Sequence, residues 1–157
     1  MTDLQEKSLQ ETYAPHNACF GCGPSNERGL RIRSFPKGEE VVATFSPEAH
    51  HLAFPGILNG GIIGTLLDCH CNWTASYSLM KSQDADSPPC TVTASYEIRL
   101  KQVTPVDTEL QIRAWATEIK GSKAVIEGVI EVDGKVTAEC TGVFVAVKPG
   151  HPAYHRW

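Results

Sequence analysis

Residues 55–70 read PGILNGGIIGTLLDCH, and they contain the start of a predicted helix. Asn59 is followed by Gly60 and Gly61, and a mostly apolar run then leads to Asp68. Asn is a good N-cap residue, because its side chain accepts hydrogen bonds from the free amides of a helix's first turn. Apolar residues continue at helical spacing beyond Asp68. The sequence therefore predicts one long helix over 58–80, with Asn59 as its N-cap.

Strand-like segments lie on both sides of the predicted helix. Residues 30–35 and 39–46 are short candidates joined by a hairpin-like turn. Four longer runs rich in Val, Ile, Thr and aromatic residues follow the helix, at 90–103, 108–119, 123–133 and 135–148. Asp133-Gly134 predicts a type I′ hairpin between the last two, since such turns need positive φ. One long helix with a meander of about six antiparallel strands predicts an α+β fold in which the sheet covers the helix.

The size and charge of the chain limit the kinds of protein to which it can belong. A chain of 157 residues fits one domain, and 41 % hydrophobic and 20 % charged residues are ordinary for a globular protein. The net charge is −4 without any block of Lys or Arg, which argues against nucleic acid or a membrane surface as partner. The polar N-terminus lacks the apolar core of a signal peptide, and no apolar run reaches the roughly 20 residues of a membrane span. We expect a cytoplasmic protein with a polar leader at 1–18, one folded domain at 19–148 and a tail at 149–157.

Six cysteines are scattered along the chain: Cys19, Cys22, Cys69, Cys71, Cys90 and Cys140. Without a secretion signal, disulfides are not expected. The CFGC motif has the spacing of half a zinc site, yet a complete structural site needs four ligands. No second CxxC is present, although histidines elsewhere are potential further ligands. The sequence favours free thiols, and we expect no metal and no cofactor.

The start of the predicted helix has the chemistry of an oxyanion site. Helix N-termini present unpaired N–H groups at the positive end of the dipole, and glycine there lets another molecule's carbonyl approach the backbone. Asp68 shares its helix face with small residues, namely Gly61, Gly64, Thr65, Cys71, Asn72 and Ala75, whereas the other face is apolar and is expected to pack on the sheet. Partial burial on such a face raises the pKa of a carboxylate, which suits it to act as a base. In the alternative interpretation, the glycines mark a tight turn or close packing and Asp68 is a solvated helix residue.

Three segments in order, CFGCGPSNERGL, FPGILNGGIIGTLLD and VTASYEIRLKQVTP, resemble the hotdog-fold thioesterases of the PaaI-like acyl-CoA thioesterase family. The resemblance covers residues 19–148, and its most specific piece is the glycine pair followed by the acid at 60–68. It implies a hotdog fold, in which a curved antiparallel sheet wraps around one long helix. It also implies a homodimer or homotetramer with active sites between subunits.

By the same resemblance, the protein hydrolyses an acyl-CoA to the free acid and CoA. Asp68 matches the acidic residue that activates water or attacks the thioester carbon, and Gly60 matches the glycine whose backbone N–H polarises the carbonyl. Thr93 falls where the family often has a Ser or Thr that positions the water, across the subunit interface. No G-x-S-x-G motif is present, which disfavours the other common thioesterase design.

The sequence departs from the family at Asn59, where His-Gly-Gly is usual. Asn caps a helix or donates to a substrate carbonyl, but it carries no proton. We place Gly61, Thr65 and His51 at the substrate. Two alternatives stay open: a non-catalytic protein that binds acyl thioesters, and a 3-hydroxyacyl-thioester dehydratase, since HLAFPG after His50 is similar to the HFPG of hotdog dehydratases.

Overall fold

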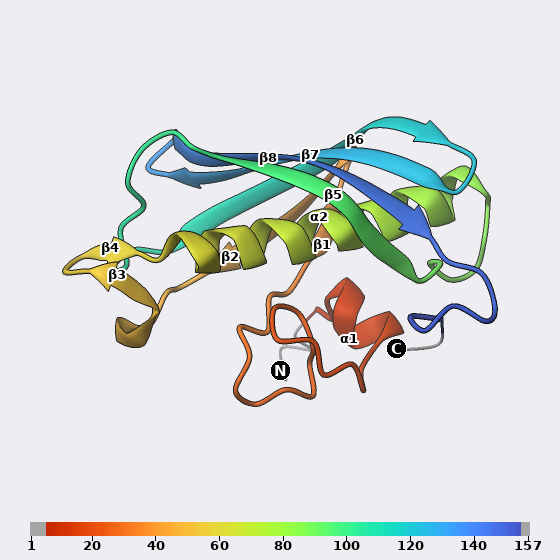
Figure 1. Cartoon of the computed structure of the whole chain (residues 1–157), viewed down its shortest axis with the longest axis horizontal. Helices are drawn as coiled ribbons and strands as arrows, with labels where there is room; N and C mark the ends of the chain where they lie inside the picture. The colour runs from red at the N-terminus through yellow and green to blue at the C-terminus, as the bar shows by residue number, and fades with distance from the viewer. Residues whose placement is uncertain (1–5, 155–157) are drawn as a thin grey trace.

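The long helix α2 (Gly60–Ser82) lies against one face of a six-stranded antiparallel sheet (Figure 1). The computed structural model describes residues 6–154 of the chain. The strands of this sheet are β1 (Phe35–Lys37), β2 (Glu40–Phe45), β5 (Thr91–Leu100), β6 (Leu110–Lys120), β7 (Lys123–Val132) and β8 (Lys135–Ala146). Their order is β1-β2-β6-β7-β8-β5, so that β1 and β5 are the edges. The predicted α+β fold, with one long helix and about six strands, is confirmed.

The long helix and the four long strands lie close to the positions that the sequence predicts. The four long strands agree with the predicted runs to within a few residues at each end. Asp133 and Gly134 join β7 to β8 with φ angles of 50° and 76°, the left-handed values that a type I′ turn requires. The helix begins after Asn59, whose side chain accepts two backbone hydrogen bonds.

The core lies between α2 and the sheet. From the helix it takes Ile63, Leu66 and Leu67, and from the sheet it takes the side chains of Ile112, Ile126, Ile130 and Phe144. Gly128 on β7 matters for this packing, because a Cβ there would overlap the sulfur of Cys71 on the helix. The side chain of Cys71 can therefore sit directly on the strand backbone.

The first predicted strand is largely wrong. Only Phe35 of the 30–35 segment belongs to β1, and the residues before it run along the N-terminal loop instead. The N–H of Leu30 donates to the carbonyl of Phe20 at 2.7 Å, and the N–H of Ile32 donates to Gly21 O at 3.0 Å. The alternation of apolar and polar residues is real, since Leu30 and Ile32 are both buried, but their hydrogen-bond partner is a loop and not a sheet strand.

A short helix, α1 (Leu9–Tyr13), forms in the stretch that the sequence analysis assigned to a polar leader. Ser8 and Glu11 make a reciprocal capping box at its start, a pattern that the sequence shows and that could have predicted it. Leu9 and Ala14 are buried. Figure 1 shows this N-terminal segment on the side of α2 that faces away from the sheet.

A second, two-stranded sheet precedes α2. It consists of β3 (Leu52–Phe54) and β4 (Ile57–Leu58), and it follows a 3-10 turn, η1 (Ala49–His51). The N–H of Asn59 donates to the carbonyl of His51 at 3.0 Å, which fixes this small sheet to the helix start. Among residues 6–154, no helix combines the length and the apolar character needed to cross a membrane.

Candidate active site

The first turn of α2 leaves one amide available. The side-chain oxygen of Asn59 accepts hydrogen bonds from the N–H groups of Gly61 and Ile62, at 2.8 and 3.2 Å. The carbonyl of Asn59 accepts from the N–H of Ile63 at 3.1 Å. The N–H of Gly60 has no acceptor within the described part of the chain, and Gly60 itself is exposed. The helix therefore presents the Gly60 amide outward, at the positive end of its dipole.

Asp68 lies in the middle of α2 and is half-buried. The hydroxyl of Thr93, on edge strand β5, donates to Asp68 Oδ1 at 2.7 Å. The ladder between β5 and β8 shifts register between Thr93 and Ser95, and such bulges re-aim side chains next to functional sites. The two residues belong to the same chain, whereas the sequence analysis placed Thr93 across a subunit interface.

Asp68 and Thr93 line a cavity of about 370 Å³ between α2, β5 and the N-terminal loop. The other lining residues are Asn17, Cys19, Cys22, Cys69, Asn72, Trp73 and Val92. The cavity thus surrounds a carboxylate whose orientation is fixed by a hydroxyl donor. A larger open groove of about 720 Å³ lies at the far end of α2, lined by Tyr77 and Lys81 among others, and contains neither Asp68 nor Thr93.

Asp68 and the Gly60 amide are too far apart to act on one thioester within one chain. Eight residues of helix separate them, which at 1.5 Å per residue is about 12 Å along the axis. Reacting groups and the donors that stabilise them must lie within about 3 Å of the reacting atoms. A site that uses both groups therefore needs a second copy of the chain.

The remaining predicted substrate contacts lie at the helix start. Gly61 is exposed and its N–H is used by the N-cap. Thr65 is half-buried, and its hydroxyl donates to the carbonyl of Gly61 at 2.9 Å. His51 is buried on η1, where its Nδ1 accepts from the N–H of Glu48 at 3.0 Å. His51 does not line the cavity that holds Asp68, so within residues 6–154 these two do not form the acid–histidine pair that a dehydratase would use.

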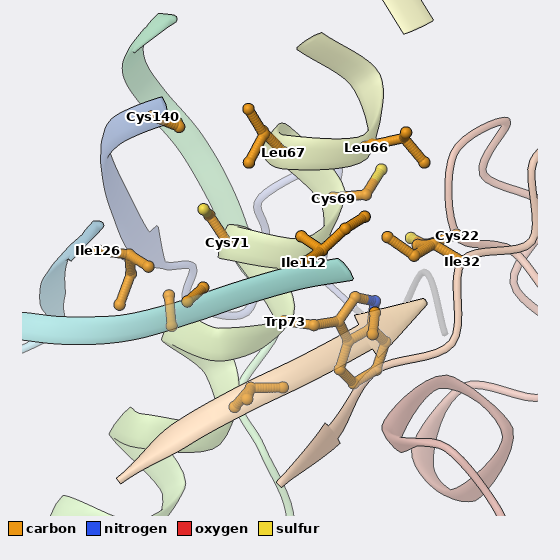
Figure 2. Close-up of a cluster of buried hydrophobic side chains, with 14 of the residues drawn as sticks. Cys22, Ile32, Leu66, Leu67, Cys69, Cys71, Trp73, Ile112, Ile126 and Cys140 are labelled. Carbon is orange, nitrogen blue, oxygen red and sulfur yellow. The ribbon is translucent and has the colours of Figure 1, made fainter. Parts of the chain in front are cut away.

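The predicted stripe of small residues is open over only part of its length. Gly64, Thr65 and Asn72 are half-buried like Asp68, but Cys71 and Ala75 are fully buried. Figure 2 shows the reason for Cys71, which points from α2 toward the sheet and away from the N-terminal loop. Cys71 and Ala75 therefore do not lie on the half-buried face of Asp68, with which the sequence analysis grouped them.

His70 is a packing residue. It is fully buried, with its Nε2 2.8 Å from the carbonyl of Val41 and its Nδ1 2.8 Å from the hydroxyl of Ser34. Ser34 also accepts from the side chain of Gln10 at 2.9 Å. Burial lowers the pKa of His70 to about 4, so the ring is neutral and joins α1, the loop, α2 and β2 in one buried network.

The CFGC pair has a third sulfur beside it that sequence reasoning missed. Cys69 of α2 faces the N-terminal loop, and its sulfur lies 3.8 Å from that of Cys19, a residue 50 positions earlier (Figure 2 shows Cys69 and Cys22). Hydrogen bonds from Cys22 and Cys69 lower the pKa of Cys19 to about 2. The bond to Cys19 raises the pKa of Cys22 to about 12. No spacing rule could predict this contact, because only the packing of the loop on α2 creates it.

Solved structures resemble about three quarters of the chain. No family profile and no curated protein sequence matches it. A thioesterase superfamily protein from Shewanella loihica PV-4 is 30 % identical with a TM-score of 0.65, over 74 % of this chain and 91 % of that protein. The PaaI protein of the phenylacetic acid degradation operon of E. coli is 16 % identical with a TM-score of 0.64, over 76 % of this chain and 81 % of PaaI.

A third similar structure was solved with a ligand. The smu.793 protein of Streptococcus mutans UA159, bound to acetyl CoA, is 17 % identical with a TM-score of 0.62, over 74 % of this chain and 88 % of that protein. At such identities, this protein and PaaI show only that the fold is the same. The hotdog fold that the sequence resemblance implied is confirmed.

Proposed function

This chain belongs to the thioesterase superfamily, and from that premise we propose that it hydrolyses an acyl-CoA to the free acid and CoA. Asp68 activates the attacking water or attacks the thioester carbon itself, and the Gly60 amide polarises the thioester carbonyl. The observation that carries the proposal is that α2 presents two groups suited to this reaction, a backbone amide and a carboxylate. One is an outward amide without an acceptor in the described chain, and the other is a carboxylate held by Thr93 in a cavity.

The chemistry of each group fits thioester hydrolysis. As water or carboxylate adds to the carbonyl carbon, negative charge develops on the carbonyl oxygen, where the Gly60 N–H and the helix dipole stabilise it. In the general-base route, Asp68 takes the proton of the attacking water, and Thr93 fixes the carboxylate with its hydrogen bond. The intermediate collapses with loss of the CoA thiolate, which leaves readily and needs no dedicated general acid.

Asn59 serves this site indirectly. Its side-chain oxygen is used by two amides of the first turn, so it holds the helix start rigid and leaves the Gly60 amide as the outward donor. An Asn in place of the family's usual His removes any proton transfer at this position. The proposed mechanism therefore assigns acid–base chemistry to Asp68 alone.

The distance between the two groups supports a homo-oligomer with shared sites. A carboxylate and an amide about 12 Å apart on one helix meet at one substrate only if they come from different copies. Exposed large apolar residues gather on β3, on β5 and just after it: Leu52, Phe54, Tyr96, Leu100 and Val103. Leu100 lies beside Gly60, so an interface over this surface would border the site.

CoA thioesters are the proposed substrate class, and the acetyl CoA bound to the similar S. mutans protein supports this choice. The test is a panel of acyl-CoAs of different chain length and aromatic character, with free thiol release as the readout. We expect release by the wild type and its loss in Asp68→Asn, with the oligomer intact by light scattering. Tight binding of the panel without thiol release would overturn the proposal and favour the non-catalytic binding protein.

A further inference from the structure

Three cysteines from two separate parts of the fold gather at one point. Cys19 and Cys22 come from the N-terminal loop, and Cys69 comes from the middle of α2. All three sulfur atoms lie within 4.8 Å of one another, and those of Cys19 and Cys69 are 3.8 Å apart. Cys22 and Cys69 are buried, whereas Cys19 is partly exposed. Three thiols at this spacing form a set of soft ligands for one ion.

The spacing fits a tetrahedral zinc ion. A Zn–S bond of about 2.3 Å and tetrahedral angles place neighbouring sulfurs about 3.8 Å apart. This is the distance between the sulfurs of Cys19 and Cys69. No disulfide joins any of the six cysteines, which all lie within the described chain.

The loop is shaped around these sulfurs. A Cβ at Gly21 would overlap the sulfur of Cys69, so only glycine lets the loop backbone come this close to α2. A Cβ at Gly23 would overlap the backbone of Cys19, and the N–H of Gly23 closes the turn by donating to Cys19 O at 2.8 Å. The N–H of Cys19 donates in turn to the side chain of Asn17 at 2.8 Å.

A buried donor also faces the cluster. The indole of Trp73 is buried on α2, and its N–H forms a hydrogen bond to the side chain of Cys22. Donors to ligand sulfurs orient the first ligands of a metal and are common around thiolate sites. The loop turn and Trp73 thus both direct sulfur atoms toward one point.

We propose that Cys19, Cys22 and Cys69 bind one Zn²⁺ ion, with the fourth coordination position open to the cavity that holds Asp68. Binding forms three Zn–S bonds, and each cysteine that is still a thiol releases its proton to solvent. A water molecule from the cavity completes the tetrahedron, since three protein ligands and an open position are a common zinc arrangement. The cysteines line the same cavity as Asp68, so the fourth position faces it.

The ion would connect the loop to the turn of α2 that carries Asp68. Cys69 directly follows Asp68 in the sequence, and the loop that carries Cys19 and Cys22 forms one wall of the cavity. Zinc held between them would fix that wall at a set distance from the carboxylate. The proposed role of the ion is therefore to position the loop relative to Asp68. This proposal does not depend on thioester hydrolysis.

The test is metal uptake by the purified, reduced full-length protein. We expect one zinc per chain by elemental analysis after incubation with zinc sulfate and gel filtration. We also expect thiolate-to-cobalt charge-transfer absorption when Co²⁺ replaces Zn²⁺. Cys69→Ser should weaken zinc binding by at least about 100-fold, because a buried ligand is lost. Cys90→Ser is the matched control, since Cys90 lies outside the cluster, and it should bind as the wild type does.

Three outcomes would overturn the proposal. They are a wild type that takes up less than half a zinc per chain, a cobalt adduct without charge-transfer absorption, and a Cys69→Ser variant that binds zinc as tightly as Cys90→Ser. If Cys69→Ser fails to fold, Cys19→Ser replaces it, because Cys19 is the partly exposed ligand. Metal uptake is read without substrate, so its failure and the failure of the proposed hydrolysis are distinguishable.

Discussion

At the scale of single residues, Gly60 and Asp68 have separable roles. Gly60→Pro removes the backbone N–H but suits the first position of a helix, and the extended Asn59 (φ −61°, ψ 133°) is the conformation favoured before proline. We expect kcat to fall by about 10²–10³, the usual effect of losing one oxyanion donor. Steady-state kinetics on the best acyl-CoA measures this.

Gly60→Ala is the matched control for that substitution. It keeps the N–H, and its Cβ would lie 3.6 Å from Leu100 Cδ1, an ordinary contact. We expect activity close to that of the wild type. Equal losses in both variants would mean that the backbone shape matters and the amide does not.

Thr93 is expected to act by orienting Asp68. Thr93→Val keeps the shape of the side chain and removes the hydrogen bond to Asp68 Oδ1. Hydrogen bonds to charged groups contribute about 1.5–3 kcal/mol, so kcat should fall roughly 10- to 100-fold with little change in KM. Thr93→Ser should restore most of the rate. A change confined to KM would place Thr93 in substrate binding instead.

His51 predicts a pH dependence of stability. Burial, together with the neighbouring His50, lowers the pKa of His51, and its Nδ1 accepts a hydrogen bond only when unprotonated. The unfolded chain then binds the proton at higher pH than the folded chain, so this contribution to stability is present above about pH 6.5 and is lost as the pH falls. Urea unfolding should show a smaller penalty for His51→Gln at about pH 5.5 than at about pH 7.5. An equal penalty at both values would contradict this.

At the scale of elements, the first turn of α2 combines stability and chemistry. Asn59→Ala removes the N-cap oxygen and should cost about 1 kcal/mol of unfolding free energy. Asn59→Asp keeps an acceptor oxygen and should retain stability, but its negative charge lies next to the Gly60 amide and repels the developing oxyanion. We therefore expect Asn59→Asp to be stable and slow. Chemical denaturation and kcat/KM, measured on both variants, separate the two effects, and a fully active Asn59→Asp would count against an oxyanion at Gly60.

The N-terminal segment shows how a loop becomes part of the domain. Its sequence is polar, yet α1 and the following loop pack on α2 through buried residues such as Leu9, Ile32 and Ser34. The hydrogen bond from Ser34 to His70 lies at the centre of this contact. The segment therefore forms a third layer, on the opposite side of the helix from the sheet (Figure 1).

At the scale of the whole molecule, shared sites predict complementation. Gly60→Pro and Asp68→Asn should each be inactive as homo-oligomers. In a mixed dimer, the Gly60 of one chain faces the Asp68 of the other, and one of its two sites is intact. Refolding the two variants together should restore roughly a quarter of the wild-type activity by statistical mixing. No recovery, with mixed oligomers verified by native mass spectrometry, would mean that the two groups act within one chain.

Much of the fold could be predicted because its signals are local. The helix and its cap at Asn59, the four long strands and the turn at Asp133-Gly134 depend on side chains within a few residues of one another. The capping box of Ser8 and Glu11 was equally local and predicts a helix that composition alone concealed. The strand predicted at 30–35 failed because alternation reveals which side chains are buried but not which backbone they pair with.

The long helix, the free amide expected at its start and the carboxylate two turns later could all be predicted from the sequence, because helical spacing and capping are properties of one segment. Three contacts depend on tertiary packing: Thr93 of the same chain donates to Asp68, Cys71 is buried against Gly128, and Cys69 lies beside the CFGC pair. Each of these contacts joins residues far apart in the chain. Their geometry depends on how the loop, the helix and the sheet pack together, and a local sequence pattern does not predict this packing.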